Sequence, residues 1–173
     1  LAVMSLRNGD IETSLEPLET ILEYSHGKLD QKLWMIANML GREKDKALVM
    51  QVMEKLLLEH QQDPEALYAF AHVAARIGNL DRAEELLLAT LERAPDNDNA
   101  AMSYISILQK QGRLNDALKW IETILPTRED NDFNLRSAYA RLLTDAKRFD
   151  EARRQFEILA VQAPNNSDVL FAL

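Results

Sequence analysis

A six-residue pattern recurs along the chain at a nearly constant interval. It reads Gly-Asn-Leu-Asp-Arg-Ala at 78–83 and Gly-Arg-Leu-Asn-Asp-Ala at 112–117, an interval of about 34 residues. Lys-Arg-Phe-Asp-Glu-Ala follows at 147–152, one position later than a strict period places it, and a weaker copy stands at 9–14. Self-similarity at such a period is typical of an array in which each repeat is one small structural unit. The repeat therefore predicts a stack of similar units.

Each repeat contains apolar residues at three- and four-residue spacing, which places one apolar stripe on each of two helices. The stripe is clearest at 64–97, through Leu67, Phe70, Ala71, Ala74, Ala83 and Leu87. Alanine at a helix crossing lets two backbones approach closely. The second helices are expected to be capped by Asp81, Asn115 and Asp150, with Asp81 and Glu84 forming a capping box.

This unit, with a turn glycine and a late proline such as Pro95 or Pro164, resembles the tetratricopeptide repeat. The resemblance implies an all-α fold, a right-handed superhelical array of antiparallel helix pairs. Within a single solenoid fragment, 1–173, the expected divisions are a partial repeat at 1–29, repeats at 30–63, 64–97, 98–132 and 133–166, and the start of a further repeat at 167–173. Two positions at 30–63 depart from the pattern: Val49 replaces the close-packing alanine and Lys44 the turn glycine.

Composition and motifs argue against several classes of site. The absence of cysteine excludes disulfides and thiolate sites, and a net charge of -8 opposes nucleic-acid binding. No apolar run approaches the roughly 20 residues that cross a bilayer, so membrane insertion by this segment is not expected. Phosphate-binding glycine loops and nucleophile motifs are absent, and the three histidines lack ligand spacing. We therefore predict no enzyme activity, cofactor, metal ion or catalytic residue.

The candidate site is a concave face made by the first helix of each repeat. The resemblance implies that these helices line a groove for a protein or peptide. Carried over position by position, the candidate partner-binding residues are Trp34, Met35, Asn38, Arg42, Tyr68, His72, Arg76, Met102, Ser106, Lys110 and Arg141. Aromatic anchors and small polar residues together suit an extended segment or a helix. The alternative is that Trp34, Tyr68 and Met102 belong partly to the core and that the basic residues favour helix C-termini.

The expected function is a protein-interaction scaffold, an adaptor or assembly platform. Alternatives are an accessory module of a larger enzyme and a self-association module. Recognition of chaperone tails is disfavoured, because Trp34, Ala69 and Asn99 stand where clamp residues are expected. The short segments Ala-Pro-Asp-Asn at 94–97 and Ala-Pro-Asn-Asn at 163–166 resemble those of bacterial multi-repeat adaptors of the cell envelope. This resemblance favours a periplasmic or envelope location over a cytoplasmic one. Trp120, on a second helix, is expected at the outer surface or between repeats.

Overall fold

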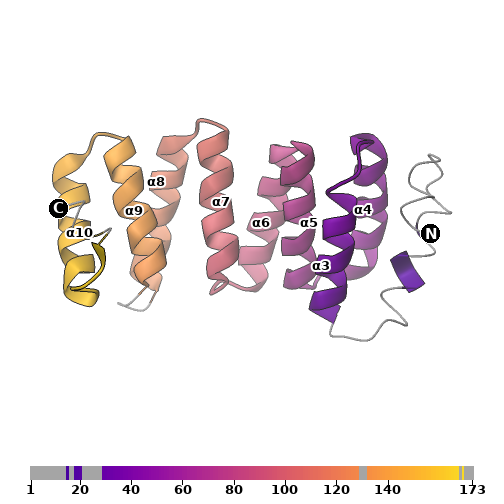
Figure 1. Ribbon diagram of the computed structural model, residues 1–173, viewed down its shortest axis with the longest axis horizontal. Helices are drawn as coiled ribbons and strands as arrows, with labels where there is room; N and C mark the ends of the chain where they lie inside the picture. Colours follow the sequence, from indigo (N-terminus) through magenta and orange to yellow (C-terminus); the bar gives the residue numbers. More distant parts are fainter. Residues whose placement is uncertain (1–14, 16–17, 21–28, 129–131, 168, 170–173) are drawn as a thin grey trace. The chain divides into compact units, whose positions relative to one another are not determined.

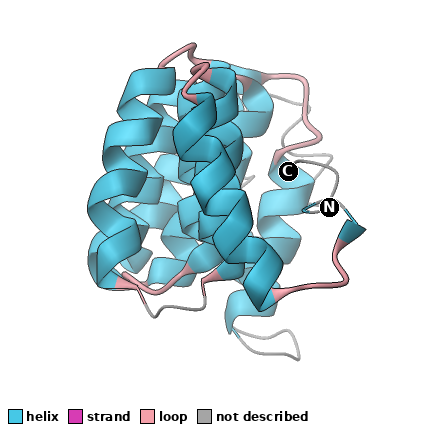
Figure 2. Cartoon of the chain, turned by 90° about the vertical axis from the view of Figure 1, so that its left-hand side faces the viewer, coloured by secondary structure: helices cyan, strands magenta, loops and turns pink. Residues whose placement is uncertain are grey.

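The computed structural model describes Leu15, residues 18–20, 29–128 and 132–167, and Val169. Within these residues all regular structure is helical, as Figure 2 shows, which confirms the all-α prediction. The partial repeat expected at 1–29 and the further repeat expected at 167–173 lie mostly outside this part of the chain. Helix contacts divide the chain into two compact units, Leu1–Asn97 and Asp98–Leu173, and each is described by itself.

The first unit is built around one central helix. Its described helices are α3 (Leu29–Leu40), α4 (Lys46–His60), α5 (Pro64–Ile77) and α6 (Leu80–Arg93). Helix α5 packs against α3, α4 and α6 (Figure 1), and more than half of its residues are buried. Ala74 of α5 and Ala83 of α6 are completely buried, as expected of small residues where helices approach closely.

The second unit repeats this arrangement. It contains α7 (Asp98–Lys110), α8 (Leu114–Ile124), a short 3₁₀ turn (Leu125–Thr127), α9 (Phe133–Asp145) and α10 (Phe149–Gln162). Helix α9 packs against α7, α8 and α10. Its buried face includes Leu142 and Leu143, and beside it Ala140 packs with Leu159 of α10 and Val169. Ile105, at a position where a small residue is usual, is also buried.

Left-handed residues end three of the first helices in the same way. Gly78 and Gly112 have φ angles of 88° and 73°, and Lys147 adopts φ 60° at the equivalent place. After each of them, the next backbone N–H donates to a carbonyl five residues back, for example Asn79 to Ala74 at 2.9 Å. This pattern satisfies carbonyls that a helix C-terminus leaves open.

The predicted helix caps are wrong by two residues. The side chain that caps α6 belongs to Asn79, whose Oδ1 accepts a hydrogen bond from the Arg82 N–H at 3.2 Å. Asp81 already lies in the first turn of the helix. Asn115 and Asp150 likewise lie inside α8 and α10. The error arises because Asn79 and Asp81 are both good caps, and the turn geometry at Gly78 decides between them.

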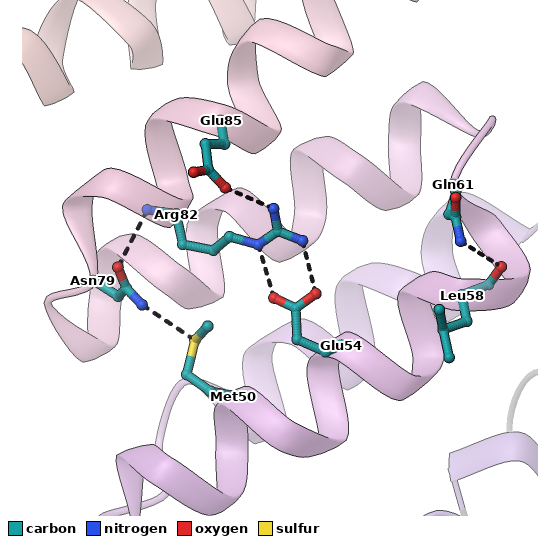
Figure 3. Close-up of polar contacts among 7 residues, drawn as sticks. All are labelled: Met50, Glu54, Leu58, Gln61, Asn79, Arg82 and Glu85. Carbon is teal, nitrogen blue, oxygen red and sulfur yellow. Dashed lines mark hydrogen bonds and ion pairs between the residues drawn. The ribbon is translucent and has the colours of Figure 1, made fainter.

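A glutamate and an arginine join the second helices within each unit. In the first unit, Arg82 of α6 donates from Nε and Nη2 to the two carboxylate oxygens of Glu54 on α4, both at 2.7 Å (Figure 3). Arg82 also donates to Glu85 at 2.8 Å. In the second unit, Arg148 before α10 donates to Glu122 of α8 at 2.8 Å and to Glu151. An ionic bridge therefore connects the described second helices of each unit.

Candidate functional site

Three side chains of the predicted face form one aromatic cluster in the first unit. The ring centroids of Trp34 on α3 and Tyr68 on α5 lie 5.4 Å apart at 74°, and those of Tyr68 and His72 lie 4.9 Å apart at 87°. Trp34 and His72 are 5.1 Å apart at 60°. All three side chains are half-buried. Edge-to-face contacts of this kind fix ring orientation and leave part of each ring for a ligand.

A polar group adjoins this cluster one helical turn away. The Asn38 side-chain amide donates to the Trp34 carbonyl at 2.9 Å, and Arg76 Nη1 donates to Asn38 Oδ1 at 3.4 Å. Arg76 crosses the end of α3 at Gly41, because a Cβ added there would lie 3.0 Å from Arg76 Nε. The structure therefore brings Trp34, Asn38, Tyr68, His72 and Arg76 together on α3 and α5.

Two more predicted residues belong to the α3 end of this unit. Met35 is 44% exposed, and Arg42 is exposed just beyond the end of the helix. Both are therefore available to a ligand of this helix face.

Three predicted residues of the second unit form a row on one helix. Met102, Ser106 and Lys110 stand four residues apart on α7, so they share a face of that helix. Met102 is 37% exposed, Ser106 is half-buried and Lys110 is exposed. Arg141 is exposed on α9. A continuous row from Trp34 to Arg141 stays a prediction, since the two units are described separately.

Trp120 packs within its own repeat. Its ring contacts Tyr104 of α7 with centroids 5.0 Å apart at 66°, so it lies against the first helix of its own repeat. Tyr104 is buried and Trp120 is half-buried. The two residues stand on different, antiparallel helices, so no helical spacing connects them. Sequence reasoning also missed Gly41, whose role depends on where Arg76 of another helix lies.

The described titratable groups with a shifted pKa lie in or beside the two ionic bridges. Hydrogen bonds, chiefly to Glu54, raise the pKa of Arg82, and those to Glu151 and Glu122 raise the pKa of Arg148. The Arg148 hydrogen bond lowers the pKa of Glu151. Burial and then the Glu122 charge raise the pKa of Tyr139, whose hydroxyl donates to Glu122 at 3.2 Å. These groups stabilise helix contacts and do not belong to the ring cluster.

Other kinds of site are not visible in the described part of the chain. Its residues contain no cluster of three or more histidine, aspartate or glutamate side chains that could hold a metal ion. None of the described helices is long and apolar enough to cross a bilayer. An open depression of about 510 Å³ lies at the α4–α5 connection, lined by Leu58, Glu59, His60, Gln61, Gln62 and Asp63. It contains none of the predicted site residues.

Comparisons with known proteins agree with this architecture. The chain is similar to MamA AMB-1, with 24% identity, a TM-score of 0.59 and coverage of 83% of this chain and 82% of that one. TTC0263, a tetratricopeptide repeat protein of Thermus thermophilus, has 16% identity and a TM-score of 0.61 over 98% of this chain and 92% of its own. YrrB, a tetratricopeptide repeat protein with an unusual peptide-binding site, has 19% identity and a TM-score of 0.57 over 82% and 72%.

A search of curated proteins finds no match. The sequence model of the tetratricopeptide repeat family matches residues 68–132, which span the end of the first unit and the beginning of the second. Stacked helical repeats of this kind are scaffolds for protein interaction, and the chain has that architecture. Over residues 68–132 the chain is therefore similar in sequence to the tetratricopeptide repeat family, and its described helix pairs have the fold of solved tetratricopeptide repeat proteins.

Proposed function

We propose that the chain is an adaptor or assembly platform whose first helices hold an extended segment or a helix of another protein. The observation that carries the proposal is the ring cluster of Trp34, Tyr68 and His72 on neighbouring first helices. Rigid aromatic side chains give a large contact area at small cost in conformational entropy, and they are enriched among residues that dominate binding. The proposal assigns the chain no reaction of its own.

Two further observations support a ligand on the first helices. Met35 and Met102 are large apolar side chains, 44% and 37% exposed, on the first helices α3 and α7. Methionine adapts its shape to a partner and is common at binding surfaces. YrrB, which has a similar fold, has a peptide-binding site, and this supports the class of ligand.

The experiment uses the immobilised chain to capture partners and then measures the affinity of one purified partner for single variants. Trp34→Ala and Tyr68→Ala should each weaken binding at least tenfold if the rings are anchors. Leu58→Ala is the matched control, because Leu58 is an apolar side chain of α4, 67% exposed and outside the first helices. If the partner binds both ring variants as tightly as wild type but does not bind Leu58→Ala, it binds elsewhere on the chain, and the proposal is wrong.

A further inference from the structure

We infer that the face shared by α3 and α5 takes an acidic peptide segment. A carboxylate of the segment pairs with Arg76, and a neighbouring apolar side chain lies against Trp34, Tyr68 and His72. The inference rests on the proposed function and adds the chemistry of the ligand. It concerns the first unit alone, since all four residues belong to α3 and α5.

Arg76 is held in place but its charge is not neutralised. Its Nη1 donates to the neutral amide oxygen of Asn38 at 3.4 Å, and its Nε and Cδ lie 3.0 and 3.1 Å from where a Cβ on Gly41 would stand. The side chain is exposed, and no carboxylate in the described residues pairs with it. A guanidinium has five N–H donors in a planar fork that matches a carboxylate. Most of these donors therefore remain for a ligand.

Three arginines on the second helices or their caps differ in this respect. Arg82 pairs with Glu54 at 2.7 Å, Arg148 with Glu122 at 2.8 Å and Arg113 with Asp116 at 2.7 Å. The chain has 28 acidic against 20 basic residues, so carboxylates are abundant. Arg76 and the exposed Arg42 pair with no carboxylate within the described part of the first unit. This local positive charge on an acidic protein complements an acidic ligand.

The ring cluster determines where an apolar side chain of the ligand lies. His72 and Arg76 are four residues apart on α5, so the rings and the guanidinium occupy adjacent turns of one helix face. A single short segment can therefore contact both. A nucleic acid fits less well, because the net charge of -8 repels a long polyanion, whereas a short peptide carries few charges.

The test selects peptides from a random-sequence library displayed on phage, with the chain as bait. Selected peptides should be enriched in aspartate or glutamate beside an aromatic or aliphatic residue, and their binding should weaken with salt. Arg76→Gln should lower the affinity for a synthesised copy of a selected peptide about tenfold, as expected for the loss of one charge-assisted contact. Replacing the peptide's acidic residues by their amides should lower its affinity for the wild-type protein by the same factor. The same replacement should change its affinity for the Arg76→Gln variant little.

Two variants distinguish a specific ion pair with Arg76 from nonspecific attraction between the peptide and positive charge on the protein. Gly41→Ala keeps the net charge but pushes Nε and Cδ of Arg76 aside by a few tenths of an ångström, so it should weaken the binding of acidic peptides less than Arg76→Gln does. Arg154→Gln removes an exposed arginine of α10 in the other unit and should change nothing. An equal loss with Arg154→Gln, or no loss with Gly41→Ala, would overturn the inference.

The remaining outcomes distinguish this inference from the proposed function. Peptides that need Trp34 and Tyr68 but lack acidic residues and tolerate Arg76→Gln would overturn the acidic ligand and leave peptide binding intact. If no peptide is selected, or selected peptides are indifferent to both the ring and the Arg76 variants, the proposed function fails as well.

Discussion

Lys147 adopts the left-handed turn conformation that Gly112 adopts one repeat earlier, with φ angles of 60° and 73°. A residue with a Cβ is strained in this region of backbone space, and glycine is not. Lys147→Gly should therefore raise the free energy of unfolding by about 0.5 to 1 kcal/mol, the strain relieved less the added entropy of the unfolded chain. Urea denaturation followed by circular dichroism measures it.

Gly112→Ala is the opposite substitution and should lower stability. A Cβ at Gly112 would meet no atom within 4 Å, so any loss comes from the backbone alone. A Gly112→Ala protein as stable as wild type would contradict the explanation given for both residues.

Ala83→Leu should overpack the contact of α6 with its neighbours. Ala83 has no exposed surface, and added methyl groups in a packed core cost about 1 to 3 kcal/mol. The control is Ala47→Leu at an exposed position in the first turn of α4, which should leave the urea midpoint almost unchanged. Equal stability of the Ala83→Leu protein and wild type would reject the repeat register.

Glu54→Gln should weaken the contact between α4 and α6. The pair with Arg82 has two 2.7 Å contacts, but the side chains are 43% and 30% exposed, so we expect a loss of only about 0.5 to 1 kcal/mol. Salt screens exposed charges, and the difference from wild type should shrink at high ionic strength. Thermal melts at low and high salt test this, with exposed Glu59→Gln as the control.

Glu151 should make stability depend on pH in the acidic range. Its pKa lies below the ordinary value of 4.5 because Arg148 donates to its carboxylate. A lowered folded-state pKa contributes stability that is present above the unfolded value and is lost as pH falls through the folded value. Glu151→Gln should therefore melt earlier than wild type at neutral pH and alike at a pH well below 4.5. Asp150→Asn, on a side chain 90% exposed, should show no such convergence.

Tyr68→Ala combined with Met102→Ala tests whether one ligand uses both units. The double variant should bind a captured partner about 2 kcal/mol or more weakly than wild type, and more weakly than either single variant. The helical circular dichroism should be unchanged. Affinity equal to that of Tyr68→Ala alone would show that the ligand does not depend on α7.

The helix pair of 64–97 was predictable because local and long-range signals agree there. Apolar spacing, the turn glycine Gly78 and the buried Ala83 all indicate the same register, and α4 begins one repeat length before α6. The α3–α4 turn was less predictable. Helix α3 ends at Leu40, and the connection runs from Gly41 to Asp45 without a left-handed residue at Lys44.

The candidate site was predictable in position but not in its contacts. Trp34 and Tyr68 occupy the same position in successive repeats, and His72 follows one helical turn later, so the three rings share one face. Whether Arg76 meets a carboxylate or Asn38 depends on how α3 lies against α5, which sequence spacing does not fix. The same reason accounts for the unforeseen Tyr104–Trp120 contact.

The two ionic bridges bear on how such a chain can change length during evolution. Glu54 and Glu122 stand two repeat lengths apart, and each has its arginine inside its own unit. Gain or loss of two neighbouring repeats therefore adds or removes the glutamate and the arginine of one bridge together. Loss of the single repeat 64–97 would remove Arg82 and bring Asp116, its equivalent in the next repeat, to the place opposite Glu54. Arg113, the equivalent of Arg148, would come to the same place and would pair with Glu54 as Arg148 pairs with Glu122, so a bridge would persist with its arginine moved from the helix to the helix cap.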